Sequence, residues 1–406
     1  MKENKTKPDI RFKGFTEAWE QRKFGELLNE TRDKTTIEDE DILLSCAIDG
    51  MFLNSELFSH FRGSSNIGYL KIKKNNLILS AQNLHLGNCN VNLRFEHGII
   101  SPAYKVYELV ECNPLFMQAW VKQDTTKEFF LRASTEGASV CRKNIVWEEL
   151  YKQTLPVPKI DEQEKIGEYF ASLDNLITLH QRECDQLKEL KKSMLKKMFP
   201  RDGSSIPEVR FAGFTDAWEQ RKFSKLVTIE RGGSPRPIDE FITKDENGLN
   251  WVKIGDAPEQ GNYITQTAEK IKPEGLSKTR EVHPGDLILS NSMSFGRPYI
   301  MAIDGCIHDG WLAIRDTEKR FDLKFLCTLL GTNNMLNQYK AMAAGSTVNN
   351  LNKELVGGTI VSYPNTAEQI KVGMYFEQLD SLITLHQREL EILKNLKKTC
   401  LKRMFI

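Results

Sequence analysis

Two arginines on a glycine-rich segment are one place where this sequence could bind nucleic acid. Residues 231–237 read Arg-Gly-Gly-Ser-Pro-Arg-Pro, which describes a short rigid loop opened by two glycines. An arginine can donate two hydrogen bonds to O6 and N7 of guanine, and free backbone amides in such a loop can bind phosphate. The alternative is an ordinary loop after a strand, and the segment taken alone favours that alternative.

Other loops are rich in asparagine, glutamine and serine. Residues 82–88 and 290–297 follow 77–80 and 287–290, which share the sequence Leu-Ile-Leu-Ser. Amide side chains can pair with N6 and N7 of adenine, so these loops suit the reading of base edges, although plain turn chemistry explains them equally well. The polar run 345–353 ends in a lysine, and it could clamp a phosphate or cap a helix.

Two pairs of repeated segments must position these loops. Residues 8–24 and 207–223 are identical at thirteen of seventeen positions, and 162–199 closely resembles 368–405. The offset between the copies grows from 199 to 206 residues, so the second half is seven residues longer between its repeats. The chain therefore runs through a short repeat, a variable block and a long repeat, and then through the same series again.

The variable blocks, about 25–157 and 224–361, share only short fragments such as Gly-Ala-Ser-Val at 137–140 and Gly-Ser-Thr-Val at 345–348. Duplication followed by divergence of the middle explains this pattern, so two equivalent scaffolds carry two different reading heads. Apolar patterns predict strands at 69–72, 77–80, 103–109 and 287–290, and helices at 115–123 and 325–339. Each block is thus expected to be a mixed α/β domain.

The long repeats are predicted to be helices of about 38 residues, or ~57 Å. Apolar residues recur at alternating steps of four and three, from Ile166 to Met198 and from Val372 to Met404. Sustained heptads indicate a coiled-coil seam, and the two copies can pair with each other within one chain. An antiparallel pair would place the variable blocks at opposite ends, related by a pseudo-two-fold axis. Pro158 and Pro364 precede the two helices, and Pro200 follows the first.

Some side chains in the repeats invite a functional interpretation that we do not favour. His180 and His386 occupy seam positions, where they could form a metal pair or a pH switch, but polar seam residues more often fix register. The aromatic residues of the short repeats could be stacking platforms for bases. We expect them instead to pack each variable block onto the long helices, because they are the same in both halves. These aromatic residues are Phe12, Phe15, Trp19, Phe211, Phe214 and Trp218.

The composition suits two cytosolic domains. The 406 residues exceed one ordinary core, and 40% hydrophobic with 27% charged residues fits neither a disordered nor a membrane protein. Lys and Arg total 56 against 55 Asp and Glu, so no global positive field attracts a polyanion. The eight cysteines show no Cys-x-x-Cys spacing, which predicts reduced, mostly buried thiols. We expect a cytoplasmic location and no membrane partner.

The motifs of common catalytic sites are missing from the sequence. No phosphate-binding Gly-x-x-x-x-Gly-Lys, dinucleotide-binding Gly-x-Gly-x-x-Gly or His-Glu-x-x-His motif occurs. The segment Asn113-Pro114-Leu115-Phe116 is close to the Asn-Pro-Pro-aromatic box of amino-methyltransferases, but it lacks the second proline and reads as a helix start. We therefore predict that the chain catalyses nothing by itself, with no catalytic, cofactor-binding or metal-ligating residue.

The repeat pattern resembles the HsdS specificity subunits of type I restriction–modification enzymes over nearly the full length. The resemblance is carried by the duplicated Arg-Phe-x-Gly-Phe-x-x-Ala-Trp-Glu-Gln-Arg-Lys-Phe, by the duplicated Glu-Gln-x-Lys-x-Gly helix, and by Gly-Ser-Thr-Val-x-x-Leu-Asn-Lys at 345–353. The matching run of the first block, at 137–144, keeps only part of this last pattern. The fold it implies is α/β (mixed), with two target recognition domains joined by an intramolecular antiparallel coiled coil.

The same resemblance implies a division of labour along the chain. The expected segments are an N-terminal repeat (1–24), a first recognition domain (25–157), a central helix (158–200), a linker with the second short repeat (201–223), a second recognition domain (224–361) and a C-terminal helix (362–406). Each recognition domain would read one half of a bipartite, non-palindromic site in double-stranded DNA. The helices would set the spacer and dock the partner subunits.

The implied partners carry the chemistry. Two modification subunits would bind S-adenosylmethionine and methylate adenine N6, and two restriction subunits would complete a nuclease that uses ATP and Mg. This chain would be a non-catalytic specificity subunit without a cofactor. The alternatives are a coiled-coil adaptor with two protein-binding domains and no DNA role, and a free-standing methyltransferase or nuclease, which the missing motifs oppose.

The predicted DNA-binding residues come from the polar loops and from local charge. Residues 25–56 carry nine acids against two bases, and 57–107 carry six bases against one acid, so we expect a basic face on the first block with acidic surface elsewhere. The predicted residues are Lys71, Lys73, Lys74, Gln82, Asn83, His85, Asn88, Arg94, Ser139, Arg142, Lys143, Arg231, Ser234, Arg236, Asn291, Ser292, Ser294, Arg297, Ser346, Thr347, Asn349, Asn350 and Lys353.

Overall fold

The computed structural model describes residues 7–59, 65–139, 142–201, 203–291, 295–343 and 351–406, with the backbone alone at 136–139 and 142. The chain divides into two compact units that do not follow chain order. The first unit combines Met1–Leu179 with Leu390–Ile406, and the second is His180–Glu389. Each unit thus holds one variable block together with part of both long helices.

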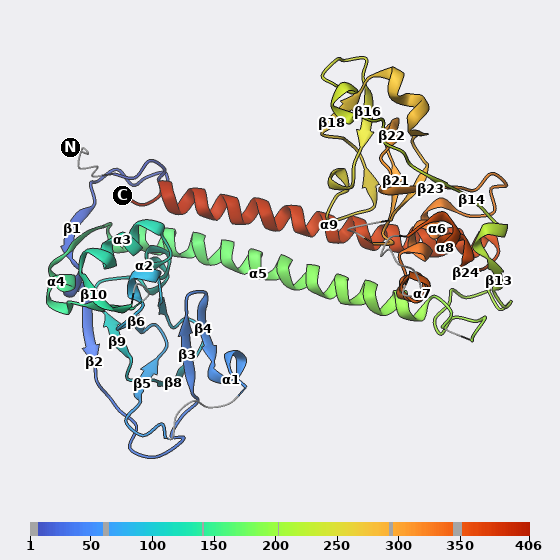
Figure 1. Cartoon of the computed structure of the whole chain (residues 1–406). Coiled ribbons are helices and arrows are strands. Elements are labelled where there is room, and N and C mark those ends of the chain that lie inside the picture. The colour runs from blue at the N-terminus through green and yellow to red at the C-terminus, as the bar shows by residue number, and fades with distance from the viewer. Residues whose placement is uncertain (1–6, 60–64, 140–141, 202, 292–294, 344–350) are drawn as a thin grey trace. The chain divides into compact units, whose positions relative to one another are not determined.

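The two long repeats form the helices α5 (Ile160–Lys197) and α9 (Thr366–Arg403), each 38 residues long (Figure 1). Both begin two residues after the predicted proline boundaries, Pro158 and Pro364. The heptad positions of both helices are buried or half-buried, as the apolar pattern predicts. Within the described part of the chain, no helix is both long enough and apolar enough to span a membrane.

The helices pair antiparallel within each unit. In the first unit, Tyr169 of α5 contacts Cys400 of α9, with 3.4 Å between Oη and Sγ. In the second unit, Lys191 of α5 binds Asp380 of α9. Residue numbers therefore rise along one helix as they fall along the other, which confirms the predicted antiparallel seam.

The first variable block is built around one antiparallel sheet of order β2-β9-β6-β7. Its strands are β2 (Leu28–Thr31), β9 (Tyr104–Leu109), β6 (Leu77–Ser80) and β7 (Cys89–Val91). Three smaller pairs accompany it, namely β3 (Leu44–Ala47) with β4 (Gly50–Leu53), β5 (Leu70–Lys73) with β8 (His97–Ile100), and β10 (Ser134–Ser139) with β11 (Arg142–Ile145). The helices are α1 (Asn54–Leu57), α2 (Pro114–Val121), α3 (Asp124–Arg132) and α4 (Trp147–Lys152).

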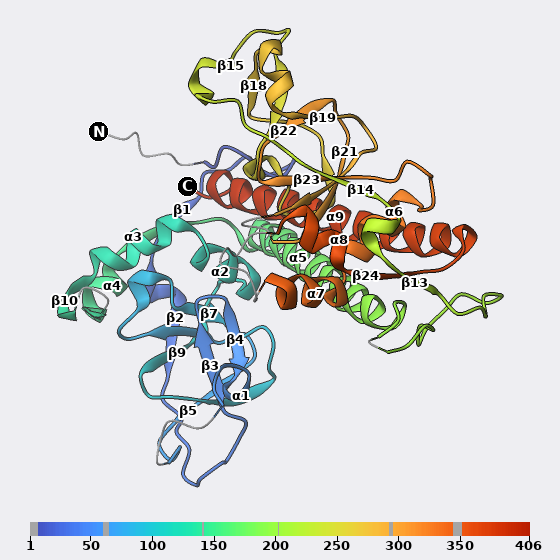
Figure 2. The same ribbon diagram turned by 45° about the vertical axis from the view of Figure 1, so that its right-hand side comes forward.

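The second variable block contains two five-stranded sheets. The order β14-β23-β20-β21-β17 comprises Thr228–Arg231, Trp311–Arg315, Leu287–Ser290, Pro298–Met301 and Tyr263–Ile264. The order β15-β18-β16-β22-β19 comprises Ile242–Thr243, Glu269–Ile271, Leu249–Val252, Gly305–Ile307 and Arg280–Val282. Helices α6 (Leu323–Leu330), α7 (Asn333–Ala343) and α8 (Lys353–Gly358) complete the block. Within this unit, the sheet with β15, β18 and β22 lies on the side away from the long helices (Figure 2).

The shared Leu-Ile-Leu-Ser segments are the strands β6 and β20, and all four residues of each are buried. Side chains alternate across a strand, so Leu77 and Leu79 enter the core shared with α2 and α3 while Ile78 packs among residues of the smaller strand pairs. In β20, the side chains of Leu287 and Leu289 likewise enter one hydrophobic core while that of Ile288 enters another. Both faces of each central strand are covered, which explains why the apolar run is continuous.

The predicted strands are confirmed, but the helix predicted at 325–339 is two helices. Helix α6 ends at Leu330, and α7 begins at Asn333. The side chain of Thr332 accepts a hydrogen bond from the Met335 amide, 3.4 Å away, and so acts as the cap of the second helix. Gly331 follows the first helix at its C-cap. Apolar periodicity continued across this break and concealed it.

The short repeats close each variable block. Strand β1 (Glu20–Lys23) pairs antiparallel with β12 (Thr154–Val157), the strand that leads into α5. In the second half, β13 (Glu219–Lys222) pairs with β24 (Ile360–Tyr363), which leads into α9. Each variable block therefore begins and ends beside its own long helix.

The aromatic residues of the short repeats pack as scaffold. The ring of Trp19 lies 6.2 Å from that of Phe116 and 6.1 Å from that of Phe405. In the second unit, Trp218 lies 5.8 Å from Phe325, the matching neighbour. Trp19 shares its core with Phe170 of α5, and Trp218 shares its core with Phe376 of α9, so the expectation that these rings pack the blocks onto the helices is confirmed for both tryptophans.

A buried ion pair anchors each short repeat to a long helix. In the second unit, Nε and Nη2 of Arg210 donate to the two carboxylate oxygens of Glu368, at 2.6 and 2.7 Å. Arg11 and Glu162 form the same pair in the first unit, with both contacts at 2.6 Å. The glutamates lie in the first turns of α9 and α5, where the helix dipole also favours a negative charge.

The next residues of the long repeats hold the variable block by its backbone. Gln369 accepts a hydrogen bond from the Asp322 amide at 2.9 Å, and its own amide donates to the Pro364 carbonyl at 2.9 Å. A side-chain carbon at Gly373 would lie 2.5 Å from Oδ1 of Asp322 and 2.7 Å from the Phe325 nitrogen. Gly373 therefore permits the close approach of α6 to α9. The first unit repeats this arrangement with Gln163.

Candidate nucleic-acid interface

The loops after β6 and β20 meet the same partner segment in both units. In the second unit, the Leu351 amide donates to the Asn291 carbonyl at 3.0 Å. In the first unit, the Lys143 amide donates to the Gln82 carbonyl at 3.2 Å. Lys143 and Leu351 are equivalent, since each lies six residues after the glycine of the repeated Gly-x-Ser/Thr-Val run. Segments that the sequence singles out separately are thus neighbours in the fold.

Two loops of the second block converge on Asp309, a residue that sequence analysis missed. Its carboxylate accepts a hydrogen bond from Ser234 Oγ at 3.0 Å, and His308 Nε2 lies 2.8 Å from the same oxygen. Its backbone carbonyl accepts bonds from Asn291 Nδ2 at 2.8 Å and from Arg231 Nε at 3.4 Å. Asp309 thereby ties the 231–237 loop to the loop after β20.

The glycines of the 231–237 loop do not offer their amides to phosphate, so that part of the prediction is wrong. The Gly232 amide donates to the Trp311 carbonyl at 2.9 Å, and the Gly233 amide donates to the Ile307 carbonyl at 3.1 Å. A side-chain carbon at Gly232 would lie 2.2 Å from the His308 carbonyl oxygen. The glycines serve close backbone packing, and the arginines remain as the groups that can contact a ligand.

Arg236 is an exposed cation of this loop. Its side chain is 83% exposed, and its nearest described carboxylate oxygen, on Asp309, is 3.9 Å away. A cavity of about 990 Å³ lies beside the loop, and its lining includes Ser234, Arg236, Trp251, Lys253 and His308. A polyanion entering this region would meet Arg236 beside a largely buried indole, while Lys253 is paired with Glu269 at 2.6 Å.

Two predicted residues of the second block are occupied by structural bonds. Asn291 is 3% exposed, and its amide is used on Asp309. Arg297 donates to the carbonyl oxygens of Glu259 and Gly261 at 3.0 and 3.1 Å, and its guanidinium packs over the ring of Tyr299. These side chains fix the shape of the loop, so we do not place them on the proposed binding surface.

The last polar run of the second block ends as a helix cap. The Asn352 side chain accepts a hydrogen bond from the Leu355 amide at 2.8 Å, and α8 begins at Lys353. Lys353 is largely exposed, 3.8 Å from a carboxylate oxygen of Glu354. The helix-cap alternative is therefore correct for Asn352, while Lys353 stays available to solvent.

The expected basic face of the first block is largely neutralised, which corrects the reasoning from local charge. Lys71 binds Glu40, and Arg94 binds Glu56 through two contacts of 2.7 and 3.0 Å. Lys105 lies 3.2 Å from Glu30. Acids and bases that are segregated in the sequence alternate in space, because folding brings 25–56 against 57–107.

These ion pairs affect the titration of the acids. The hydrogen bond from Lys71 lowers the pKa of Glu40, and the hydrogen bond from Arg94 lowers the pKa of Glu56. Both carboxylates therefore remain charged at neutral pH and compete with phosphate for the same cations. Lys74 is also paired, 2.5 Å from Glu96, but on an exposed surface where such a pair is weak. Lys73 is exposed and forms no ion pair with any residue in the described ranges.

The loop after β6 places His85 beside Lys143. Burial, and secondarily the charge of Lys143, lowers the pKa of His85, so the ring is neutral at physiological pH. Both ring nitrogens of His85 and Oδ1 of Asn88 are buried without a hydrogen-bond partner among the described residues. Gln82 is exposed at the surface of this loop, and Asn83 is half-buried.

The structure does not describe the side chains of the remaining predicted residues. Ser139 and Arg142 face each other in the β10–β11 ladder, where only the backbone is described. Four residues of the last polar run and two serines of the loop after β20 lie outside the described residues, namely Ser346, Thr347, Asn349, Asn350, Ser292 and Ser294.

The seven cysteines that the structure describes are free and buried, as predicted.

Comparison with known proteins supports the repeated architecture. A family model described as "Type I restriction modification DNA specificity domain" matches residues 2–189 and again 215–395. The chain is 24% identical over 291 residues to the MjaVIII type I restriction enzyme specificity subunit of Methanocaldococcus jannaschii, covering 67% of this chain and 65% of that protein. It thus spans just under two thirds of that relative.

Two further similarities cover more of the chain. The putative MjaX type I restriction enzyme specificity subunit of the same organism is 23% identical over 355 residues, covering 86% of this chain and 76% of that protein. The crystal structure of a type I restriction–modification S subunit from M. genitalium shares the fold, with a TM-score of 0.63, 14% identity and coverage of 98% and 99%. With two matched domains spanning most of its length, this chain belongs to the type I restriction modification DNA specificity domain family.

Proposed function

We propose that this chain is the DNA-specificity subunit of a type I restriction–modification complex. Each variable block would read one half of a bipartite, non-palindromic site in double-stranded DNA. One observation carries the proposal: in both units the loop after an identical Leu-Ile-Leu-Ser strand accepts a backbone hydrogen bond from the residue six positions after the glycine of the Gly-x-Ser/Thr-Val run, although the loops themselves differ. The same strand and contact recur in both units while the loops differ. Two different DNA half-sites would require such an arrangement.

The chemistry of the second block supports direct contact with DNA. Arg231 and Arg236 supply cations around Asp309 and the neighbouring cavity, and a third cation, Lys253, is paired with Glu269. Arginine can bind a phosphate or fork onto guanine, so these residues can position the duplex or read it. In the first block we place the contacts on Lys73, Gln82, Asn83 and Lys143, where fewer acids compete.

The long helices would set the spacing between half-sites and dock two modification subunits. In this proposal the modification subunits bind S-adenosylmethionine and methylate adenine N6, and two restriction subunits supply ATP-dependent cleavage with Mg. The relatives named above support the role of specificity subunit, from which these partner roles are proposed. Paired cations on the first block further suggest that the isolated chain binds DNA weakly and that tight binding needs the assembled complex.

The experiment combines a gel shift with adenine-methylation sequencing in a host that carries this chain with its modification subunits. We expect a bipartite methylated sequence, and a shift whose affinity falls steeply with salt because phosphate contacts release counterions. A coiled-coil adaptor without a DNA role would give neither result. A chain that transferred methyl groups without partners would contradict the non-catalytic assignment.

A further inference from the structure

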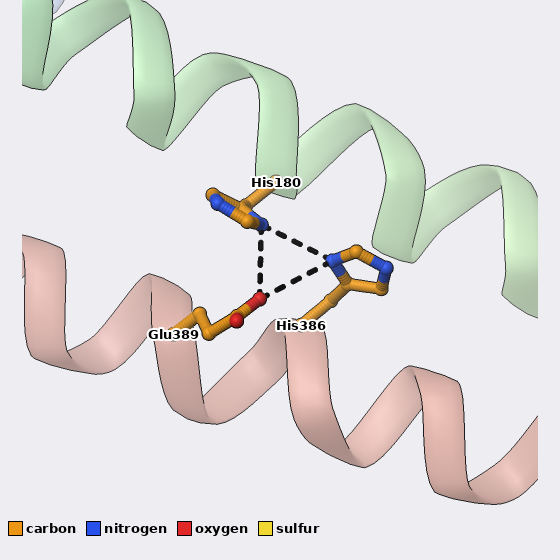
Figure 3. A group of neighbouring side chains, drawn as sticks. All are labelled: His180, His386 and Glu389. Carbon is orange, nitrogen blue, oxygen red and sulfur yellow. Dashed lines mark hydrogen bonds and ion pairs between the residues drawn. The ribbon is translucent and has the colours of Figure 1, made fainter.

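Four metal-ligating side chains converge where α5 faces α9 inside the second unit. The repeated His-x-x-Glu sequence supplies His180 and Glu183 from α5, and His386 and Glu389 from α9. Residues three apart lie on one face of a helix, so each helix presents one imidazole and one carboxylate to the other. Figure 3 shows His180, His386 and Glu389 pointing toward one another.

The distances between the donor atoms are those of a ligand shell. The two Nδ1 atoms of the histidines are 3.1 Å apart. His180 Nδ1 lies 3.3 Å from a carboxylate oxygen of Glu389 and 3.7 Å from one of Glu183. His386 Nδ1 lies 3.3 Å from the Glu183 oxygen and 3.6 Å from the Glu389 oxygen.

The separations among the ligand atoms of His180, His386 and Glu389 match three edges of a coordination tetrahedron. Zinc holds imidazole nitrogen and carboxylate oxygen at about 2.0–2.2 Å, which places tetrahedral ligand atoms about 3.3–3.6 Å from one another. The ligand atoms of His180, His386 and Glu389 all lie within 4.8 Å of one another, so a single ion can reach them. The Glu183 carboxylate lies outside this group, and its side chain, which is 40% exposed, would turn toward the ion to supply the fourth ligand.

A polar seam alone explains this arrangement less well. Two Nδ1 atoms in contact can share at most one proton, because two N–H groups or two lone pairs would repel. One such hydrogen bond would satisfy the two histidines and fix the register, but it gives no role to two carboxylates on the same atoms. A divalent cation satisfies both nitrogens and offsets both negative charges.

We propose that His180, Glu183, His386 and Glu389 bind a divalent transition-metal ion of the Zn²⁺ class, which clasps α5 to α9. The imidazoles favour Zn²⁺ and its neighbours over Mg²⁺ and Ca²⁺, which prefer shells made of oxygen. The histidine side chains are 20% and 19% exposed, so an ion can enter from solvent. This inference does not depend on DNA binding.

The test titrates the full-length chain, freed of any polyhistidine tag and of metal, with ZnCl₂ against a chromophoric zinc chelator. We expect one tightly bound zinc per chain and a visible spectrum typical of tetrahedral coordination when Co²⁺ replaces zinc. The variant H180N/H386N should bind zinc more than about 100-fold more weakly, beyond the 10–100-fold loss typical of an outer-shell partner. The variant E183Q/E389Q should also bind more weakly while retaining both imidazoles.

The matched control is H97N/H283N, which removes two exposed histidines that pair with carboxylates elsewhere. It should bind zinc like the wild type. Zinc should also raise the unfolding temperature of wild type and control, but not of H180N/H386N, because a ligand of the folded state stabilises it.

Equal zinc affinity in wild type and H180N/H386N would overturn the proposal, as would an equal loss in the control. If H180N/H386N loses its helical circular dichroism and is therefore unfolded, the zinc affinity of E183Q/E389Q is compared with that of the wild type instead. Wild-type affinity in that variant would refute the four-ligand site.

Discussion

The buried pair between Arg210 and Glu368 should be the strongest test of how the scaffold is held together. The change is Arg210→Met, which keeps an unbranched stem like the aliphatic part of arginine and removes the charge. The Glu368 side chain is 1% exposed and that of Arg210 is 11% exposed, so the substitution leaves a carboxylate away from water. It also removes both hydrogen bonds to that carboxylate.

The expected cost follows from that burial. Breaking a buried ion pair by removing one partner costs about 3–5 kcal/mol of unfolding free energy, whereas removing an exposed helix pair costs about 0.5 kcal/mol or less. The double variant Arg210→Met with Glu368→Leu leaves no buried charge, so it should recover most of the loss. The coupling between the two sites should therefore approach the cost of the single change.

The assay is urea unfolding of the four members of this double-mutant cycle, followed by circular dichroism. Lys192→Met is the matched control, because its partner Glu189 is exposed on the same helix surface. Arg11→Met should repeat the effect in the first unit through Glu162. A cost below about 1 kcal/mol for Arg210→Met, typical of exposed pairs, would show that the pair does not anchor the short repeat.

Four further outcomes are expected. Gly373→Ala should destabilise the second unit by about 1–3 kcal/mol in the same urea assay, as overpacking does. The cause is that the new carbon would lie 2.5 Å from Oδ1 of Asp322. An unchanged urea midpoint of unfolding would contradict the close packing. Arg236→Ala should weaken DNA binding by the assembled complex in gel shifts. If Arg236 binds a phosphate, the slope of log affinity against log salt concentration should fall by about one; if it reads guanine, the loss should be about 1–3 kcal/mol and specific to one base. Arg221→Ala is the control and should leave binding unchanged. Exchange of residues 25–157 for the block of another family member should alter one half of the methylated sequence, and a change in both halves would argue against separate reading heads. Insertion of one heptad into both long helices adds about 10 Å, or roughly three base pairs, so methylation sequencing should show a longer gap between unchanged halves.

Much of the scaffold could be predicted from the sequence because it obeys local rules. The heptads of α5 and α9 and the apolar runs of β6 and β20 show their burial directly in their spacing. The break between α6 and α7 was missed, since apolar periodicity does not register a threonine cap. The buried anchors were also missed, although the repeats contain both partners, because only folding shows that Arg210 reaches a glutamate 158 residues away.

The candidate interface was harder to predict, because its features depend on contacts between distant segments. The polar loops were found by composition, but their amides and side chains were partly committed to internal bonds, as in Gly232 and Asn291. Local charge sums failed for Lys71 and Arg94, since acids 31 and 38 residues away in the chain neutralise them. Asp309 gave no sequence signal apart from its position just before a strand.

The ladders β1–β12 and β13–β24 make each variable block a cassette with adjoining ends. The chain leaves the scaffold at Lys23 and returns at Thr154, which is its direct partner across the ladder. Any insertion or deletion inside the cassette is therefore absorbed without shifting the helix that follows. The seven extra residues of the second half illustrate this, since α5 and α9 are still equal in length. Genetic exchange through the near-identical short repeats could thus replace a whole cassette while the rest of the molecule needs no compensating change.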